Sequence, residues 1–414
     1  MTHDTNIPQG YKATALGIIP QEWEVRSLDY LGDIYSGGTP DTEVAEYWDG
    51  DIAWCTPSDI TKLTSKYIEN TEIKITGKGL KDSSAILLPR RSIIVCTRAT
   101  IGNAAICNTE IATNQGFKNV VPSNDTNPEW LYYIIMYSKP RLVRLGCGST
   151  FLEVSKKDFS RFKIVAPPLE EQRKIAEVLG VWDEAIEKQA RLIEKLALRK
   201  RALMQRLLSA KLRLPGFSEP WKKVNYSDIL KEVRRTLTWD ENELYDLISV
   251  RRRSGGVFHR ESLYGHEIKT KTLRPALEGD FLISKMQIVH GASGVVPKQL
   301  SGMKISGSYI ALIAKDPKEL NINYFNLWSQ MPLFYHQTFV SSYGVHIEKM
   351  TFDLDAFMSL SMNLPPIEEQ NRIVEVISTA TNEIELAKEK LERLRRQKRG
   401  LMQQLLTGKK RVKY

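Results

Sequence analysis

The sequence is poor in cysteine and has no long apolar run, and each absence excludes a class of protein. No two of its four cysteines are spaced as C-x-x-C, so neither a zinc knuckle nor a redox pair is signalled. We expect all four to be small core residues in a reducing compartment: Cys55, Cys96, Cys107 and Cys147. The start of the chain has no apolar run typical of a signal peptide, and no stretch of 18 apolar residues is present. We therefore expect a cytoplasmic protein that does not span a membrane.

Motifs of the common catalytic and nucleotide-binding sites are also missing. The sequence contains no G-x-x-x-x-G-K-[ST] phosphate loop, no H-E-x-x-H and no G-x-S-x-G. Its two Pro-Pro pairs lack the polar residue and the aromatic ring that flank Pro-Pro in adenine methyltransferases, and residues 146–148 are too short for a cofactor loop. We therefore expect a protein that is not an enzyme and that binds no metal or cofactor itself.

One pattern supports a rival interpretation as a magnesium-dependent nuclease. An aspartate precedes a Glu-x-Lys triplet once in each half of the chain, and such a set can hold Mg²⁺ and a hydrolytic water. The residues are Asp59, Glu72 and Lys74 in the first half and Asp246, Glu267 and Lys269 in the second. Such triplets also arise by chance in a chain this rich in both residues, so the nuclease stays an alternative.

The chain is basic. Its 59 lysines and arginines outnumber 49 aspartates and glutamates, which gives a formal net charge of +10. A surplus of this size favours an anionic partner such as nucleic acid, although a generally basic soluble protein is the alternative. The length of 414 residues predicts about two to four domains, each large enough for its own core.

The most informative feature is an internal repeat at an offset of 198 residues. Pro-Pro-Leu-Glu-Glu-Gln at 167–172 returns as Pro-Pro-Ile-Glu-Glu-Gln at 365–370. The correspondence continues without a gap from 167–213 to 365–411, where 21 of the 47 pairs are identical, and Trp23 and Trp221 are also 198 residues apart. We therefore predict two tandem copies of one unit, whose divergent segments recognise two different targets.

A long amphipathic helix is predicted after each Pro-Pro pair. Proline suits the first helical turn, and the glutamates that follow complement the positive end of the helix dipole. Apolar residues then recur at spacings of three and four, which is a coiled-coil pattern, over about 40 residues or roughly 60 Å. The expected seam is Ile175, Val178, Trp182, Ile186, Gln189, Ile193, Leu196, Lys200, Leu203 and Leu207 in the first copy, and Ile373, Val376, Ala380, Ile384, Ala387, Leu391, Leu394, Lys398, Leu401 and Leu405 in the second.

Lysine interrupts the seam at the same position in both copies, as Lys200 and Lys398. A single polar seam residue can fix the register and orientation of a coiled coil, although both ammonium groups can also reach solvent past their apolar stems. The simplest assembly pairs the two helices antiparallel, and two independent helical hairpins are the alternative. The basic helix ends are either solvated or in contact with phosphates or an acidic protein.

The segments before the two helices are predicted to be mixed α/β domains. In the first half, residues 51–54 and 92–96 are expected to be strands and residues 130–138 a short helix. In the second half, residues 280–284 and 309–314 are expected to be strands and residues 323–330 a short helix. The same order of elements therefore recurs with different residues.

Polar, glycine-rich loops follow these strands and supply the side chains that pair with base edges and phosphates. Such loops are also ordinary turns, so some of their residues are expected to be structural. The candidate DNA contacts are Thr97, Arg98, Thr100, Asn114, Gln115, Ser149 and Thr150 in the first half, and Arg251, Arg252, Arg253, Lys285, Gln287, His290, Ser308, Tyr343 and His346 in the second.

The duplicated motif and helix resemble the specificity subunit of type I restriction-modification systems. The resemblance rests on Pro-Pro-[Leu/Ile]-Glu-Glu-Gln followed by a long helix that ends Leu-Met-Gln-x-Leu-Leu, at 203–208 and again at 401–406. The segment 213–217 through Trp221 resembles the usual entry into the second half of the family, and Thr-Asn-Gln-Gly-Phe at 113–117 resembles a common segment of its recognition domains. The resemblance extends over nearly the whole chain.

The resemblance implies a fold of two mixed α/β target recognition domains separated by two antiparallel coiled-coil helices. The domains would be residues 1–165, the first helix 166–213, the second domain 214–363 and the second helix 364–414. Each recognition domain would bind one half of a split, asymmetric site in double-stranded DNA, the first domain reading the 5′ half, and the helices would set the gap.

The resemblance also implies the partners of the chain. Two methyltransferase subunits would methylate adenine N6 in the two half-sites, and two restriction subunits would translocate and cut DNA. S-adenosylmethionine, ATP and Mg²⁺ would belong to those subunits. Since Asn-Gln-Gly-Phe has no close copy in the second half, where residues 306–309 read Ser-Gly-Ser-Tyr, the two recognition domains are expected to differ in class. An orphan DNA-binding protein or anti-restriction decoy is the alternative.

Overall fold

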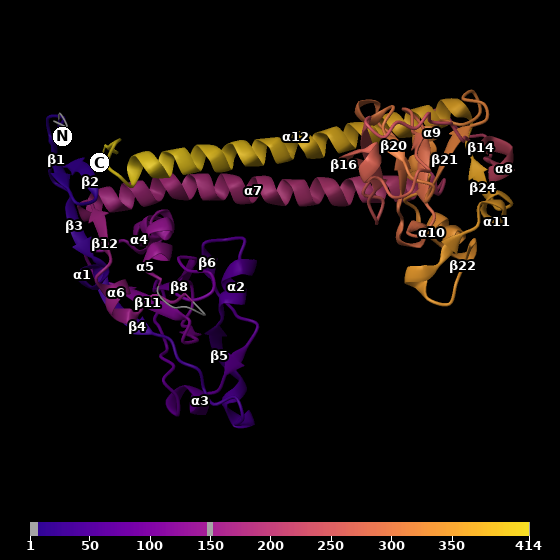
Figure 1. The fold of residues 1–414 in the computed structure, drawn as a ribbon. Coiled ribbons are helices and arrows are strands. Elements are labelled where there is room, and N and C mark those ends of the chain that lie inside the picture. Colours follow the sequence, from indigo (N-terminus) through magenta and orange to yellow (C-terminus); the bar gives the residue numbers. More distant parts are fainter. Residues whose placement is uncertain (1–6, 147–151, 414) are drawn as a thin grey trace. The chain divides into compact units, whose positions relative to one another are not determined.

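The computed structural model describes residues 7–146 and 152–413 and divides into two compact units (Figure 1). Unit 1 comprises Met1–Leu192 and Ala387–Tyr414, and unit 2 comprises Ile193–Leu386. Each unit contains small β-sheets, short helices and one part of both long helices, α7 (Leu169–Leu208) and α12 (Ile367–Leu405). The α+β class predicted from the sequence is confirmed.

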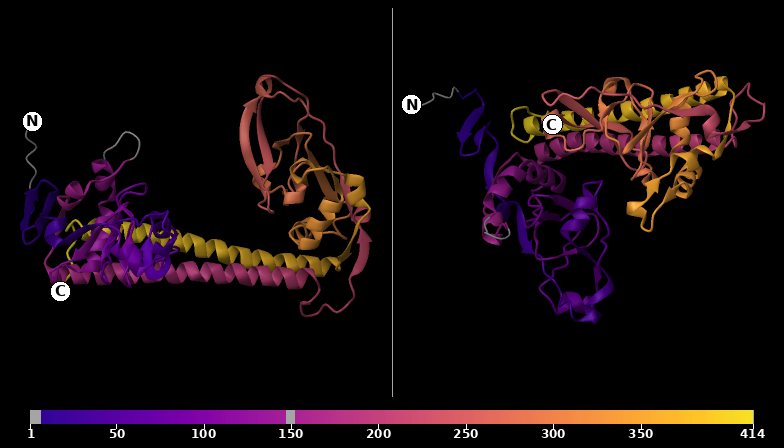
Figure 2. Two further views of the ribbon diagram at one scale, coloured as in Figure 1. Left: turned by 90° about the horizontal axis from the view of Figure 1, so that it is seen from below. Right: turned by 45° about the vertical axis from the view of Figure 1, so that its right-hand side comes forward.

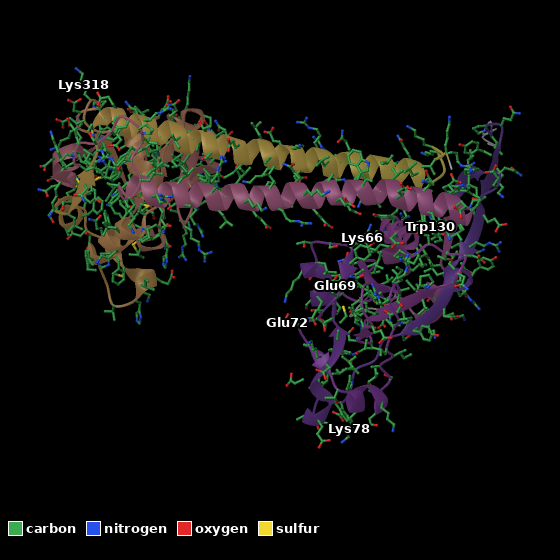
Figure 3. All side chains as sticks on the ribbon, turned by 180° about the vertical axis from the view of Figure 1, so that it is seen from behind. Lys66, Glu69, Glu72, Lys78, Trp130 and Lys318 are labelled. Carbon is green, nitrogen blue, oxygen red and sulfur yellow. The ribbon has the colours of Figure 1, made fainter. Side chains whose placement is uncertain are left out.

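The core of unit 1 is a five-stranded sheet in the order β4-β11-β8-β9-β6. Its central strand β8 (Ile93–Cys96) is buried throughout and pairs antiparallel with β11 (Phe117–Pro122) and β9 (Ala104–Cys107). The outer strands are β4 (Gly32–Ser36), antiparallel to β11, and β6 (Tyr67–Ile68), parallel to β9. Trp130 of α4 (Pro128–Tyr137) is fully buried in the core that joins this sheet to α7 (Figure 3).

The other strands of unit 1 surround this core. A second sheet has the order β10-β5-β7, formed by Ala112–Thr113, Trp48–Cys55 and Lys74–Ile75. A hairpin joins β1 (Tyr11–Thr14) to β2 (Gly17–Pro20), and β3 (Glu24–Ser27) pairs antiparallel with β12 (Lys163–Ala166). The short helices are α1 (Leu28–Leu31), α2 (Pro57–Lys62), α3 (Gly77–Lys81), α5 (Lys139–Leu145) and α6 (Lys156–Ser160).

The cysteines that the structure describes are free and buried, as the sequence predicts for core residues. Burial raises the pKa of the Cys96 thiol to about 11 and that of Cys107 to about 12, so both are neutral thiols at physiological pH. Cys147 lies outside the described residues.

Unit 2 repeats the plan of unit 1. One sheet has the order β14-β21-β18-β19, formed by Leu230–Glu232, Tyr309–Ala314, Phe281–Ser284 and Ser293–Val295. A second sheet has the order β16-β15-β20-β17, formed by Val257–Tyr264, Leu244–Val250, Lys304–Ile305 and Arg274–Pro275. Two strand pairs join β13 (Lys222–Asn225) to β24 (Ser361–Leu364) and β22 (Ser342–Tyr343) to β23 (Thr351–Phe352). The short helices are α8 (Tyr226–Ile229), α9 (Ile322–Trp328), α10 (Pro332–Val340) and α11 (Leu354–Met358).

The two units share their central elements. In unit 2, β18 lies between β19 and β21 as β8 lies between β9 and β11 in unit 1, and the pair β13–β24 takes the place of β3–β12. Both β12 and β24 lead through a Pro-Pro pair into a long helix. The strands and short helices expected at 51–54, 92–96, 130–138, 280–284, 309–314 and 323–330 are all confirmed, with end points that differ by a few residues. The predicted duplication is therefore a duplication of fold.

Helices α7 and α12 pair antiparallel within each unit (Figures 1 and 2). In unit 1, Glu171 binds Arg411 and the Gln189 side-chain amide donates to the Ala387 carbonyl at 2.9 Å. In unit 2, Arg199 forms an ion pair with Glu383. Every seam residue predicted from the sequence is buried or half-buried, including Ile175, Ile373 and Leu405, which are at most 2% exposed. The antiparallel coiled coil is confirmed, and independent hairpins are excluded.

The second glutamate of each Pro-Pro-x-Glu-Glu-Gln motif is a buried anchor. Glu171 accepts a hydrogen bond from the indole nitrogen of Trp23 at 2.8 Å and binds the Arg411 guanidinium with two contacts of 2.6 and 2.9 Å. In unit 2, Glu369 accepts from Trp221 at 2.9 Å, and Arg213 binds it at 2.7 and 2.9 Å.

Both carboxylates are at most 1% exposed. A buried carboxylate needs such partners, because burying it alone is very unfavourable. The two Trp–Glu–Arg groups therefore fix the start of each helix to the domain that precedes it.

The glutamine of the same motif ties the helix to a neighbouring helix. In unit 1, the Gln172 side chain accepts from the Asn127 backbone N–H at 2.9 Å and donates to the Pro167 carbonyl at 2.9 Å. In unit 2, Gln370 accepts from Asn321 at 2.9 Å and donates to Pro365 at 2.8 Å. Asn127 and Asn321 are the N-cap residues of α4 and α9, so the motif sets the position of an equivalent helix in each unit.

Lys398 ends in a polar cluster rather than in solvent. Its ammonium binds the Asp183 carboxylate, which also accepts from the Tyr133 hydroxyl at 2.5 Å. The Lys66 ammonium donates to the same hydroxyl at 2.8 Å and lies 3.9 Å from the Asp183 carboxylate (Figure 3). Burial lowers the pKa of Lys66, an effect that Asp183 opposes, and burial together with Asp183 raises the pKa of Tyr133.

Lys398 therefore has a carboxylate partner in unit 1, Asp183, which supports its interpretation as a register-fixing residue. The position that corresponds to Asp183 in α12 is Thr381, so the second copy lacks this carboxylate at the level of Lys200.

Replacing Glu171 by alanine should lower the free energy of unfolding by about 3 kcal/mol, because it leaves the buried Trp23 indole without its acceptor and removes the main carboxylate partner of the half-buried Arg411. Glu170→Ala is the matched control. The adjacent Glu170 carboxylate is exposed and pairs only with Arg173, so its loss should change the stability by no more than about 0.5 kcal/mol. Urea unfolding followed by circular dichroism measures both, and equal effects of the two variants would contradict the anchor.

Candidate nucleic-acid interface

Three segments of unit 1 meet at the end of β8. The backbone N–H of Thr97 donates to the Gly116 carbonyl at 2.8 Å, and the N–H of Val154 donates to the Thr97 carbonyl at 3.0 Å. Arg98 and Glu153 form an isolated antiparallel bridge. The loop 97–103, the turn 114–116 and the segment at 153–154 therefore form one surface that carries most of the candidate contacts predicted for the first half.

Arg98 is the exposed cation of this surface. Its guanidinium contacts the Glu153 carboxylate through Nη2 at 2.6 Å and Nε at 3.1 Å, and 45% of its side chain remains exposed. The Lys118 ammonium lies 3.6 Å from the same carboxylate. Burial lowers the pKa of Lys118, and the nearby Glu153 charge opposes the shift. Glu153 thus orients Arg98 and stabilises a buried lysine beneath it.

The remaining predicted residues divide into supporting and exposed groups. Thr97 is buried and its hydroxyl donates to the Gly116 carbonyl at 3.2 Å, so it supports the loop rather than lying on the surface. The Asn114 side chain accepts from the Gly116 N–H at 2.9 Å and closes the turn. Thr100 is half-buried, and Gln115 is exposed and accepts from Thr39. Ser149 and Thr150 lie outside the described residues.

In unit 2, the arginine-rich turn 251–256 joins β15 to β16 (Figure 2). The backbone N–H of Arg253 donates to the His290 carbonyl at 2.7 Å, and that of Ser254 donates to the Gly291 carbonyl at 2.9 Å. Arg253 and Ser254 both have left-handed backbone angles, with φ of 57° and 54°. A side chain at Gly291 would place its Cβ 2.2 Å from the Tyr335 hydroxyl, so glycine is required for this close approach.

Arg252, on the turn between β15 and β16, is paired with a carboxylate in unit 2 as Arg98 is in unit 1. Its Nε donates to the Gln287 side chain at 2.6 Å, and its Nη2 contacts the Glu348 carboxylate at 2.8 Å. The His290 Nε2 lies 3.2 Å from the same carboxylate. The structure therefore brings together Arg252, Gln287 and His290, which the sequence singles out separately. It adds Glu348, which sequence reasoning missed although it follows the predicted His346 by two positions.

The other predicted residues of unit 2 lie around this group. Arg251 covers the Phe258 ring at 4.0 Å, and Arg253 is exposed at a pocket of about 330 Å³ that α7 also lines. The Lys285 N–H donates to the Ser308 carbonyl at 2.9 Å, and the Lys285 carbonyl accepts from Phe352 at 3.0 Å. Tyr343 and His346 are exposed on the segment that also carries Glu348.

The carboxylates of the nuclease interpretation have structural partners. Asp59 accepts from the Thr56 backbone N–H at 2.8 Å and from the Glu72 backbone N–H at 3.1 Å, so it caps α2. The Glu72 side chain is exposed and pairs with Lys62 at 2.5 Å (Figure 3). Asp246 accepts from the Ser262 hydroxyl at 2.5 Å on the adjacent strand. Within residues 7–146 and 152–413, no three His, Cys, Asp or Glu side chains gather as a metal site would require.

No helix in the described part of the chain is long and apolar enough to cross a membrane.

A protein family described as "Type I restriction modification DNA specificity domain" matches the chain twice, at residues 20–197 and 218–396. The two matches follow the duplication seen in the sequence and the fold.

Several relatives are also specificity subunits of type I restriction enzymes. The MjaIX subunit of Methanocaldococcus jannaschii is 38% identical over 193 residues, which are 45% of this chain and 45% of that subunit. The EcoR124I/EcoR124II subunit of Escherichia coli is 28% identical over 180 residues, which are 42% of this chain and 44% of that subunit. In both cases the match spans less than half of the relative. The putative MjaX subunit of M. jannaschii is 25% identical over 447 residues and is matched over 97% of its length.

Solved structures share the fold at low sequence identity. The S subunit of a type I restriction-modification system from M. genitalium matches with a TM-score of 0.54 at 14% identity and 98% coverage of both chains. The HsdS subunit of Thermoanaerobacter tengcongensis matches with a TM-score of 0.51 at 18% identity, over 94% of this chain and 98% of that one. A chain from a study of the assembly of a type I system matches with a TM-score of 0.62 at 18% identity, over 94% of this chain and 99% of that one. Because the family matches most of both halves, this chain belongs to the family of type I restriction-modification DNA specificity proteins.

Proposed function

We propose that this chain directs a type I restriction-modification complex to a split, asymmetric DNA site, with unit 1 reading one half and unit 2 the other. The observation that supports this most directly is that each unit has one loop surface with an arginine–glutamate pair and different neighbouring side chains. Both present an arginine held by a glutamate, Arg98 by Glu153 and Arg252 by Glu348. The neighbours differ, since Gln115 lies on the unit 1 surface and Gln287 with His290 on that of unit 2.

The chemistry of these surfaces suits base recognition. An arginine guanidinium donates two parallel hydrogen bonds to guanine O6 and N7, and a glutamine side chain pairs with adenine N6 and N7 in the major groove. The carboxylate partners restrict the arginine rotamers before DNA binds, so less side-chain entropy is lost on recognition. Thr97 and Asn114 act in this proposal as loop supports.

The long helices are proposed to set the gap between the half-sites and to provide a docking surface for two methyltransferase subunits. The anchors at Glu171 and Glu369 tie each helix to a recognition domain, so a change in helix length is transmitted to the domains. Adenine N6 methylation with S-adenosylmethionine and cleavage with ATP and Mg²⁺ would be carried out by the methyltransferase and two restriction subunits. A second half-site would bind at a high effective concentration once the first is held.

The direct test is a map of N6-methyladenine across host DNA with and without this gene. Loss of one split motif on deletion would support the proposal and identify the target sequence. An unchanged map, together with no methyltransferase recovered alongside the tagged chain, would contradict it in favour of an orphan DNA-binding protein.

Arg98→Ala and Arg252→Ala should each relax specificity in one half-site only. Loss of a bidentate base contact should weaken binding of the correct sequence by about 1–3 kcal/mol and leave binding of sequences altered at that position unchanged. Competition binding of the methyltransferase complex against a library randomised in each half-site measures this. Arg90→Ala is the control, since Arg90 is an exposed arginine just before β8, at the end of that strand away from Arg98. A uniform loss over all sequences would identify a phosphate contact instead.

Duplicating residues 186–192 in α7 together with residues 384–390 in α12 should lengthen the preferred gap between half-sites. Seven residues preserve the spacing of the seam and add roughly 10 Å to each helix, which corresponds to no more than about three base pairs. The methylation motif of cells carrying the variant measures the new gap. Duplicating residues 186–192 in α7 alone should instead mismatch the two helices and lower the stability, and a gap unchanged in the double duplication would exclude the ruler.

A further inference from the structure

Unit 1 also has a basic groove, and none of the candidate DNA contacts lines it. It lies between α5 and the segment from α6 to β12 and has a volume of about 420 Å³. Four cations face it, with one carboxylate and two apolar residues. Its lining consists of Arg141, Arg144, Leu145, Asp158, Arg161, Phe162 and Lys163. We refer to these residues as the α5 groove.

The cations of the α5 groove lack carboxylate partners among the residues that the structure describes. Arg144 donates only to the Pro140 carbonyl, at 3.3 Å, and neither Arg161 nor Lys163 forms an ion pair there. The single acid, Asp158, accepts from the Ser155 hydroxyl at 2.6 Å. This differs from Arg98, Arg91 and Arg173, each of which is paired with a glutamate. The groove therefore carries a concentrated positive charge that the protein does not neutralise.

Arg141 is held in place within the groove. Its guanidinium donates to the Lys163 carbonyl at 2.8 Å and lies 4.7 Å above the centre of the Phe162 ring. Burial and the neighbouring Arg144 charge lower the pKa of Arg141, although an arginine stays protonated under these conditions. The Arg141 and Arg144 charges repel each other, and a bound anion would offset that repulsion.

Helix α5 connects this groove to the candidate DNA surface. At its first residue, the Lys139 ammonium donates to the Asn103 side chain at 2.5 Å. A Cβ on Gly102 would lie only 2.8 Å from the Lys139 side chain, so the loop 97–103 packs directly on the start of the helix. Arg144 follows five residues later, roughly 7 Å along the helix axis. That distance corresponds to about two base steps along one DNA strand, in which each base rises about 3.4 Å.

We propose that the α5 groove binds a backbone phosphate of the DNA beside the half-site that unit 1 reads. This inference rests on the proposed function and adds a positioning contact to it, because phosphate contacts fix orientation and carry no sequence information. It also distinguishes the two units. The corresponding helix α10 in unit 2 has the sequence PLFYHQTFV, which contains no lysine or arginine, so unit 2 lacks the equivalent contact.

The experiment compares the methyltransferase complex carrying Arg144→Gln/Arg161→Gln with wild type. Both side chains are exposed, so the fold should tolerate the change, which the melting temperature checks. The slope of log K against log salt concentration for a duplex with the cognate site should become shallower by about 0.9 for each lost phosphate contact. Discrimination between cognate and altered half-sites should stay the same. Lys12→Gln/Lys188→Gln removes the same charge from unit 1 outside the groove and should leave the slope unchanged.

A neutral methylphosphonate placed at single positions identifies the phosphate. In wild type, one position flanking the unit 1 half-site should weaken binding, and the same substitution should have no effect on the Arg144→Gln/Arg161→Gln variant. The proposal is overturned if the variant keeps the wild-type slope and the wild-type response to every methylphosphonate. It is also overturned if inorganic phosphate at constant ionic strength raises the melting temperature of wild type but not of the variant while DNA binding is unaffected, since the groove would then hold free phosphate. Failure of the wild-type complex to bind any split site would instead contradict the proposed function itself.

Discussion

The whole architecture depends on one buried carboxylate that occurs twice. Glu171 and Glu369 are almost fully excluded from solvent, so each must keep its arginine and its tryptophan indole as partners. In unit 1 those partners come from near both ends of the chain, Trp23 and Arg411, and in unit 2 they come from the middle, Arg213 and Trp221. Because neither partner can shift without leaving a buried charge, the start of each long helix is fixed relative to its domain. A frame with such fixed attachments can carry divergent loops without losing its geometry.

The parts that could be predicted from the sequence are those that repeat locally. The seam of α7 and α12 follows the helical period, and buried strands such as β8 and β18 are short apolar runs after a turn, so both were found from spacing alone. The sequence shows that the motif Pro-Pro-x-Glu-Glu-Gln is repeated, but it does not show that the second glutamate is a buried anchor. Its partners Trp23 and Arg411 lie 148 and 240 residues from Glu171 along the chain, and no local pattern links them.

The same reason explains what was missed in the candidate interface. The chemistry of Arg98 and Arg252 points to base recognition, but their partners Glu153 and Glu348 lie 55 and 96 residues away and become neighbours only in the folded chain. Thr97 lies in the same loop as Arg98, but its side chain is buried because it directly follows a buried strand. Alternation along an extended segment predicts that one of two neighbouring side chains faces the core, but the sequence did not show which one.

Arginines with a glutamate partner and arginines without one suit different parts of DNA binding, sequence specificity and affinity. A guanidinium that already contacts a glutamate, as Arg98 and Arg252 do, gains little from a phosphate, because the carboxylate has to be displaced or shared. A base edge with two aligned acceptors replaces the lost glutamate contact better than a single phosphate oxygen does. Cations without a carboxylate, such as Arg144 and Arg161 in the α5 groove, have no such competitor and attract any nearby phosphate. In the proposed arrangement, unit 1 would therefore combine one restrained arginine, Arg98, which favours the correct sequence, with unrestrained arginines that hold the DNA against it.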